Sequence, residues 1–350
     1  MKNNDFNNNG IKLRPNFIDI AKVLMIYLVV VGHYGYALRM QFEECPLWFT
    51  MHTITLFHMP FFFFVSGMLY KQTDLITTIK KGWIQLVVPY IALSIINLII
   101  MSSVGIFTGE FSLKQTAKVA AAIVSGSDCR WGRWWYADSL WFCYALFIIK
   151  VLTSLIKRYT NSWGGVFIPC VLGTLLMYLG DVLPFRLDSS LVGFIFFTIG
   201  NLFKNKIIRV LTNTQYTRCV SVVAAIILIV SAYINLDLSD RNGACSIDAM
   251  RYGPIPPLFI VSGISGSLLT LGLCSLFSKS KNKSLIHLSN GTIIILGFHW
   301  LMYVLIFSQF KLPSYLWANL IVSFVILLMC YPIIIMAERY CPLLLGNRKA

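Results

Sequence analysis

The first membrane-length segment of the chain carries side chains that are able to do chemistry. Beginning at Arg14, the otherwise apolar run RPNFIDIAKVLMIYLVVVGHYGY contains Asp19, Lys22, His33 and Tyr36. Lys22 and His33 are spaced so that on a helix they share nearly one face, about 16 Å apart along the axis. Asp19 and Tyr36 extend that stripe by one turn at either end. Because an ionisable group inside a bilayer is costly and usually functional, this stripe is a candidate site.

The basic residues near the stripe are open to two interpretations. The base of the stripe and the turn before the third apolar span contain Arg14, Lys22, Lys80 and Lys81. Together they would form a cationic pocket for phosphate groups at the inner membrane surface. The alternative is the ordinary cytoplasmic excess of lysine and arginine, with the charged residues at the headgroups and His33 at the far end of its helix.

A second histidine lies in the run FHMPFFFFVSGMLY. His58 precedes Pro60, and proline suits the first turn of a helix because its missing N–H would be unpaired there. We therefore expect His58 at the outer start of the second span, at a depth comparable to that of His33, so that the two imidazoles converge. Ser66 is a small residue that would let another helix approach closely. Alternatively, His58 and Pro60 only mark the start of a helix, and His58 lies at the lipid headgroups.

A third histidine, His299, follows the motif LSNGTIIILGF and is expected near the middle of the membrane. At that depth a polar group is costly, so His299 should face the interior of the bundle. Imidazole titrates near neutral pH and suits general acid–base chemistry. The candidate catalytic residues are thus His33, His58 and His299. The sequence lacks the Cys/His spacing of a metal site, and no metal is predicted.

The two longest connections on the outer side mix acids, cations and aromatic residues, and one of them contains SGSDCRWGRWWYAD. Loops of this kind on a rigid scaffold often carry binding residues. Indole rings would stack on sugar rings; the alternative for the tryptophans is the aromatic belt at the membrane interface. The candidate substrate-binding residues of the chain are Tyr36, Ser66, Trp134, Trp135 and Asp138.

Composition places these residues in a polytopic membrane protein. The 350-residue chain is 57% hydrophobic and only 12% charged, about half the charged fraction of a soluble domain. Apolar windows long enough to cross a bilayer predict about ten transmembrane helices. They fall at about 17–38, 53–70, 83–104, 139–156, 164–180, 189–204, 219–236, 256–277, 288–308 and 315–336. We expect one all-α polytopic bundle over residues 14–337, between a polar N-terminal tail, 1–13, and a C-terminal tail, 338–350.

Charge asymmetry orients the bundle. With the N-terminus in the cytoplasm, most of the 29 basic residues fall on the cytoplasmic side and most of the 14 acidic residues on the other. We therefore expect both termini in the cytoplasm and a multi-pass protein of the cell (inner or plasma) membrane. The same asymmetry accounts for the net charge of +15, so no nucleic-acid partner is predicted.

Five runs, taken in order, resemble the membrane acyltransferase 3 family, and most closely its fucose and polysaccharide O-acetyltransferase-like branch. They are RPNFIDIAKVLMIYLVVVGH, FHMPFFFFVSGMLY, LVVPY, LWFCYALF and LSNGTIIILGFHWL. The resemblance implies a ten-span enzyme that moves an acyl group, usually acetyl, from cytoplasmic acetyl-CoA to a hydroxyl of a cell-surface or lipid-linked carbohydrate. Acetyl-CoA would be a co-substrate, with no cofactor bound permanently. By this resemblance His33 matches the family's essential histidine, as general base or transient acyl carrier, and Arg14 and Lys22 match its basic positions.

The chain departs from the family pattern in two places. His58-Met59-Pro60 stands where many relatives have Gly-Val-Asp, which points to the sugar-acetylating branch. Many relatives are rich in arginine before the third span, where this chain has only Lys80 and Lys81. The pattern therefore does not identify which residues contact CoA. An alternative function is a transporter or flippase for a lipid-linked sugar or another amphiphile, but the inverted repeats and Gly/Pro-broken helix pairs typical of that class are not visible in the sequence. A membrane sensor or scaffold would leave the polar stripe unexplained.

Overall fold

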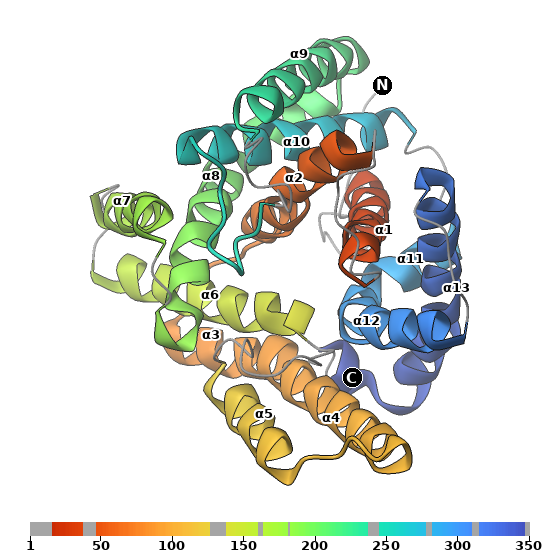
Figure 1. Cartoon of the computed structure of the whole chain (residues 1–350). Helices are drawn as coiled ribbons and strands as arrows, with labels where there is room; N and C mark the ends of the chain where they lie inside the picture. Colours follow the sequence, from red (N-terminus) through yellow and green to blue (C-terminus); the bar gives the residue numbers. More distant parts are fainter. Residues whose placement is uncertain are drawn as a thin grey trace.

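The regular structure in the described part of the chain is helical, apart from one isolated bridge between Ser246 and Arg251. The computed structural model describes residues 16–37, 47–126, 138–159, 164–180, 183–236, 245–277, 282–309 and 315–346. Figure 1 shows the helices, which are α1 (Asn16–Ala37), α2 (Leu47–Met68), α3 (Leu75–Gly82), α4 (Val88–Thr108), α5 (Leu113–Ser125), α6 (Trp141–Tyr159), α7 (Gly164–Leu179), α8 (Leu187–Leu211), α9 (Thr214–Ile234), α10 (Pro256–Leu276), α11 (Lys283–Asn290), α12 (Thr292–Gln309) and α13 (Leu316–Tyr340).

Within the described ranges, seven helical segments are long and apolar enough to cross a membrane. One of them joins α3 and α4 through a π-helical turn into the single segment Leu75–Thr108. The pair α11 and α12 would be an eighth crossing, bent by 75° at its break. Of the other predicted windows, α6 carries three basic residues, Lys150, Lys157 and Arg158, and α7 has only 16 residues. An all-helical membrane protein is confirmed, whereas ten crossings stay a prediction.

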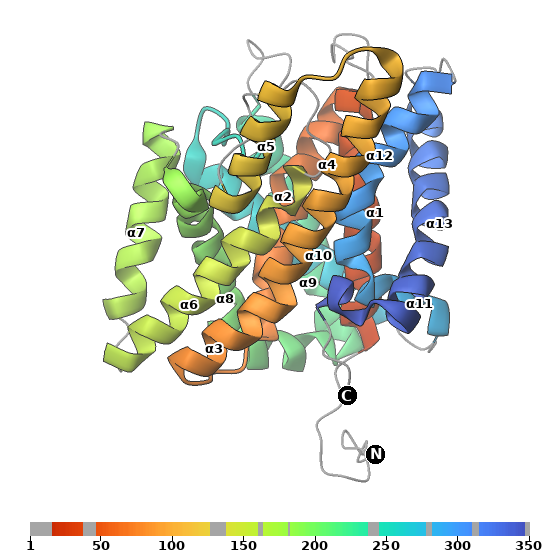
Figure 2. The ribbon, with the colours of Figure 1, turned by 90° about the horizontal axis from the view of Figure 1, so that it is seen from below.

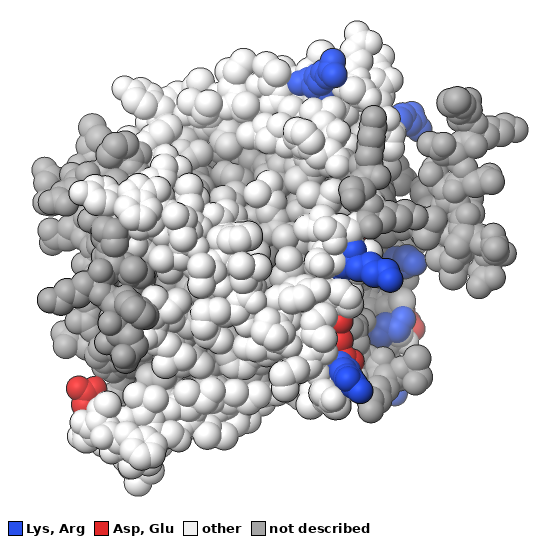
Figure 3. Space-filling model, turned by 90° about the vertical axis from the view of Figure 1, so that its right-hand side faces the viewer, with Lys and Arg blue, Asp and Glu red and all other residues white. Residues whose placement is uncertain are grey.

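The helices run alternately up and down, so that connections gather at two ends of the bundle (Figure 2). The start of α1, all of α11 and the 3-10 turn Pro342–Leu345 lie at one end, which we call the terminal end; the opposite end is the loop end. Uncharged side chains cover the middle of the face in Figure 3, and Lys and Arg gather toward the edge that belongs to the terminal end. Such an uncharged band is what a lipid-facing surface requires.

Helix α2 lies at the centre of the bundle because small residues let its neighbours approach its backbone. A Cβ atom added to Gly67 would lie 1.9 Å from the carbonyl oxygen of Phe197 in α8. Reciprocally, a Cβ atom on Gly200 of α8 would lie 2.0 Å from the carbonyl oxygen of Phe64. The glycine pair therefore fixes the α2–α8 contact, and Ser66, beside Gly67, is half-buried next to it.

Two expectations for the helix boundaries are wrong. His58 and Pro60 do not open the second span, because α2 already begins at Leu47 and both residues lie in its interior. A proline is tolerated there because neighbouring helices pack around it, and α10 approaches so closely at Gly263 that an added Cβ would lie 2.8 Å from the Cβ of Pro60. The window 288–308 is also not one straight helix, since the chain breaks at Gly291 between α11 and α12.

Candidate functional site

A cavity of about 290 Å³ lies between α1, α2, α12, the start of α6 and the segment that precedes α10. From the helices its walls include Gly32, His33, Thr55, His58, Trp141 and Trp300. The segment before α10 contributes Cys245, Ser246, Asp248, Ala249 and Arg251. Two of the three predicted catalytic histidines thus share one cavity, on which residues from opposite ends of the chain converge.

The third histidine, His299, lies directly behind His33. The two rings are 4.9 Å apart between centroids, and His33 Nδ1 lies 3.3 Å from His299 Nε2. His299 is completely buried, whereas His33 lines the cavity, with the ring of Trp300 at 5.6 Å from its own. His33 therefore stands between the cavity and a buried imidazole.

Backbone carbonyl groups assign the tautomers of this pair. His299 Nδ1–H donates to the carbonyl of Ile295 at 2.8 Å, so His299 Nε2 is the acceptor nitrogen. His33 Nδ1–H donates to the carbonyl of Val29 at 2.8 Å and shares its proton with His299 Nε2. The hydroxyl of Ser139, another lining residue, lies 3.5 Å from the same His299 nitrogen. In this assignment the basic lone pair of His33 is on Nε2.

His58 is held in the same way as the other two histidines. Its Nδ1–H donates to the carbonyl of Ile54, one turn earlier in α2, at 3.0 Å. The basic lone pair of His58 is therefore also on Nε2. A fourth histidine, the buried His52, donates from Nε2 to the carbonyl of Ala232 at 3.2 Å and is not part of the cavity wall. His52 therefore has a structural role, whereas His33 and His58 line the cavity and are placed for chemistry.

Side-chain hydrogen bonds from α12 and α13 fix the turn of α1 that carries His33. After Val29, the next two carbonyl groups of α1 also accept side-chain donors. Tyr303 Oη–H donates to Val30 at 2.8 Å, and Asn319 Nδ2–H donates to Val31 at 3.1 Å. A buried polar group must find a partner in the membrane interior, so these bonds tie three helices together around the candidate base.

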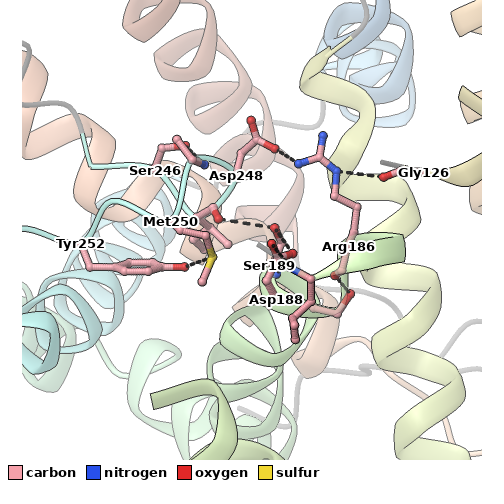
Figure 4. A network of polar contacts seen from close by, with 12 residues as sticks. Gly126, Arg186, Asp188, Ser189, Ser246, Asp248, Met250 and Tyr252 are labelled. Atoms are coloured by element: carbon pink, nitrogen blue, oxygen red, sulfur yellow. Dashed lines mark hydrogen bonds and ion pairs between the residues drawn. The ribbon is translucent and has the colours of Figure 1, made fainter. Parts of the chain in front are cut away.

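The segment 245–252 closes the cavity and is anchored by Arg186. The guanidinium of Arg186 pairs with Asp248, and its Nε–H donates to the carbonyl of Gly126 at 3.1 Å (Figure 4). It also lies 6.0 Å from the ring of Trp141 in the cavity wall. Ser189 adds a hydrogen bond from its hydroxyl to the carbonyl of Ile247 at 3.4 Å. One arginine therefore joins α5, α6, α8 and this segment.

The backbone at Arg186 is unusual. Phe185 and Arg186 both adopt positive φ, 58° and 57°, in the turn before α8. Residues other than glycine adopt this conformation at a cost, and it persists where surrounding contacts determine it. Ser190 supplies one such contact, because its hydroxyl donates to the carbonyl of Arg186 at 2.5 Å. The strained turn aims the guanidinium at the cavity segment.

At the terminal end, Asp19 and Lys22 contact the broken helix pair. Lys22 Nζ donates to the carbonyl of Ser289, and the Ser289 hydroxyl donates to Asp19 Oδ1 at 2.6 Å. A cation beside the carbonyl groups at the C-terminus of α11 is electrostatically favourable. Glycine is needed at the break, because a Cβ atom on Gly291 would lie 2.3 Å from the side chain of Ile334 in α13. Lys22 thus has a structural contact beside its predicted role.

The other predicted residues lie away from the cavity or outside the described residues. Lys80 and Lys81 are exposed in the last turn of α3, at the terminal end, and Ser66 does not line the cavity. A separate hollow of about 530 Å³ at this end is lined by residues that include Lys157 and Arg158. Arg14, Trp134 and Trp135 lie outside the described residues, and so do the side chains of Tyr36 and Asp138.

Sequence reasoning missed several residues of the site, among them Ser139, Trp141, Arg186 and Asp248. Ser139 and Trp141 belong to the run DSLWFCYALF, which is apolar after its first two residues and carries no local sign of a cavity wall. Arg186 and Asp248 are far apart in the chain, and their pairing leaves no local pattern. The one available signal was a lone arginine beside a membrane span in PFRLDSS, where an unpaired charge would be costly.

Comparison with known proteins identifies the family. The family model of an acyltransferase domain, acyltransferase 3, matches residues 16–337. No curated protein and no solved structure matches the chain significantly. The match begins with α1 and ends in α13, and it includes the three histidines and the segment that closes the cavity. The chain therefore belongs to the acyltransferase 3 family and is a multi-pass membrane acyltransferase.

Proposed function

We propose that this protein transfers an acetyl group from acetyl-CoA to a hydroxyl of a cell-surface or lipid-linked carbohydrate, with His33 as the general base. The observation that carries the proposal is the position of His33 between the cavity and His299. Acyl transfer to an alcohol needs a base that works near neutral pH, and a histidine whose orientation is fixed by hydrogen bonds meets that need.

In the proposed reaction, His33 Nε2 removes the proton of the acceptor hydroxyl as its oxygen attacks the thioester carbonyl. A C–O bond forms, the C–S bond of the tetrahedral intermediate breaks, and the CoA thiolate leaves with the proton that His33 holds. His33 is cationic between these two proton transfers. The Val29 carbonyl and His299 Nε2 then accept hydrogen bonds from its Nδ1–H and stabilise the imidazolium.

The tetrahedral intermediate needs hydrogen-bond donors near its oxyanion. The Ser139 hydroxyl and the indole groups of Trp141 and Trp300 line the same cavity as His33. We propose these groups as the oxyanion donors, with the tryptophan rings also contacting the sugar. In the alternative route, His33 itself carries the acetyl group between donor and acceptor.

We propose that the donor enters from the terminal end. CoA carries several phosphate charges, which basic residues bind by charge-assisted hydrogen bonds. The described basic residues at that end are Lys22, Lys71, Lys80, Lys81, Lys157, Arg158, Lys204, Lys206, Arg209, Arg218, Lys283 and Arg339. This excess supports a cytoplasmic terminal end and a location in the cell membrane. The pantetheine arm would reach His33 along α1, with Arg14 and Lys22 near the phosphates.

The fucose and polysaccharide branch is the part of the family that we propose for this chain. The site supports a carbohydrate acceptor because two tryptophans, Trp141 and Trp300, and the hydroxyl groups of Thr55, Ser139 and Ser246 line the cavity. Aromatic faces and hydroxyl groups together suit the mixed polar and apolar surfaces of a sugar. A lipid-linked or surface glycan would reach them from the loop end.

Mass spectrometry of surface glycans from cells with and without the gene tests this function. Loss of an acetyl-sized mass, restored by the wild-type gene and not by His33→Ala at equal protein level, is the expected result. A transporter or flippase for a lipid-linked sugar would instead remove the surface polymer and leave the modification of the remaining glycans unchanged. The broken pair α11 and α12 is a feature of that class, but among the described helices it has no counterpart in the first half of the chain.

A further inference from the structure

Among the described residues, the charges in the cavity wall do not cancel. Apart from the histidines, the acidic and basic side chains in the described part of its lining are Asp248 and Arg251. Asp248 is paired with Arg186, whose side chain is almost completely buried. Arg251 is exposed, and within the described residues no hydrogen bond or ion pair engages its guanidinium. The described part of the cavity wall therefore carries a net positive charge, at Arg251.

The backbone around Arg251 is held in place although the side chain is exposed. Ser246 N–H donates to the carbonyl of Arg251 at 2.8 Å, and Arg251 N–H donates back to Ser246 at 2.9 Å. The next residue, Tyr252, is only 3% exposed, and Asn235 Nδ2–H donates to its carbonyl at 2.7 Å. Burial and the nearby Asp188 and Asp248 carboxylates raise the pKa of Tyr252 well above its usual value, so this anchor stays neutral. Because its backbone is already fixed, Arg251 loses only side-chain freedom when it binds an anion.

We propose that Arg251 binds an anionic group of the acceptor, a phosphate or a carboxylate on or next to the sugar, and thereby selects acceptors for His33. A guanidinium makes two parallel hydrogen bonds to either group, which fixes the orientation of the sugar as well as its affinity. The identification of the ligand as an acceptor rests on the proposed function. A phospholipid headgroup offers the same phosphate chemistry, so the test must separate the two sources.

Modification of Arg251 by phenylglyoxal, followed by peptide mass spectrometry, measures anion binding without any acyl transfer. The full chain is used in a polyoxyethylene ether detergent, whose headgroup contains neither sugar nor phosphate. Glucose 1-phosphate and glucuronate are the anionic probes, glucose is the neutral probe, and glycerol phosphate represents a lipid headgroup. Exposed Arg218, in α9 at the terminal end, is the internal control.

Saturating glucose 1-phosphate and glucuronate should each slow modification of Arg251 about tenfold, whereas glucose should not, and Arg218 should react equally throughout. Equal rates at Arg251 with all probes would overturn the proposal. A second outcome would also overturn the proposal. If glycerol phosphate protects Arg251 as strongly as glucose 1-phosphate does and glucuronate does not protect it, the site binds lipid phosphate. Because no transfer occurs in this assay, its outcome is independent of the proposed function.

Kinetics then connect the site to acyl transfer. Arg251→Gln should raise the KM for an anionic acceptor about tenfold or more and leave kcat unchanged, because charge-assisted hydrogen bonds are lost before the chemical step. Arg251→Lys should recover part of the affinity. Lys114→Gln removes the same charge from an exposed position of α5 outside the cavity and should have no effect. If the KM for the anionic acceptor is unchanged in Arg251→Gln, the proposal that Arg251 selects acceptors is overturned, although the protein still transfers acyl groups.

Discussion

His33 Nδ1 lies 3.3 Å from His299 Nε2, although 266 positions separate the two residues in the chain. Each ring is also bonded to a carbonyl of its own helix, at Val29 and Ile295. With both Nδ1 atoms protonated, the basic lone pair of His33 is on its Nε2. The neutral His299 accepts from His33 Nδ1–H through its own Nε2. The pair resembles the base and orienting residue of a hydrolase triad, with an imidazole where the triad has a carboxylate.

His299 should act as a positioning residue. His299→Leu removes the acceptor of His33 Nδ1–H, so kcat should fall about 10- to 100-fold with the acceptor KM nearly unchanged. His299→Gln keeps an acceptor oxygen and should recover part of kcat. The measurement is steady-state transfer of radiolabelled acetyl groups by purified protein. Equal kcat values for the two variants would show that the acceptor at this position does not matter.

Arg186 should hold the segment that closes the cavity. Arg186→Met leaves Asp248 without its cation and the Gly126 carbonyl without its donor, and breaking such a buried pair typically costs about 3–5 kcal/mol. Hydrogen exchange in residues 245–252 should accelerate. Arg186→Lys should not restore protection fully, because lysine cannot bridge both acceptors in one plane.

A double variant provides the control for this prediction. Arg186→Met combined with Asp248→Leu removes both charges and should protect the segment better than Arg186→Met alone. Additive effects of the two substitutions would contradict a direct coupling between these side chains.

The glycines at the α2–α8 contact should be intolerant of substitution. Gly67→Ala and Gly200→Ala place a methyl group against backbone carbonyl groups, and overpacking of this kind costs about 1–3 kcal/mol or more. Gly32→Ala is the matched control, since nothing lies within 4 Å of its added Cβ. Thermal unfolding in detergent should show lower midpoints for the first two variants only. A loss of the same size in Gly32→Ala would point to helix backbone effects instead of packing.

Arg14 should contribute to donor binding. Arg14→Ala should raise the KM for acetyl-CoA about tenfold while that for the acceptor changes little, because a charge-assisted bond to phosphate contributes about 1.5–3 kcal/mol. Lys114→Ala, which removes an exposed charge of α5 outside the basic residues of the terminal end, is the control. A larger effect on the acceptor KM than on the donor KM would reassign Arg14.

The apolar windows predicted the helices well because burial in lipid demands long runs of apolar residues, which are local in sequence. Two boundaries failed where tertiary packing decides. Pro60 looked like a helix start, yet α10 covers it at Gly263 and α2 continues through it. Gly291 looked like the opening of a span, yet it separates α11 from α12, at a point where an added Cβ would lie 2.3 Å from the side chain of Ile334 in α13.

The histidines of the site were predictable because polar residues stand out in apolar runs. Their partners were not, since a contact between α1 and α12, or between Arg186 and Asp248, depends on how distant segments pack. Ser139 and Trp141 were missed for a different reason. Their run is apolar, and nothing in its local pattern distinguishes a residue that lines a cavity from one that fills the core.

The most direct test of the account compares His33 with His52. His33→Gln and His52→Gln make the same change in neighbouring helices, but only His33 lines the cavity, whereas His52 donates to the Ala232 carbonyl. Purified variants with equal thermal stability are assayed for transfer of radiolabelled acetyl groups from acetyl-CoA to a carbohydrate acceptor. We predict that His33→Gln lowers kcat at least about 100-fold and that His52→Gln retains most of the activity. Activity of His33→Gln within a few-fold of the wild type would contradict the assignment of His33 as the base.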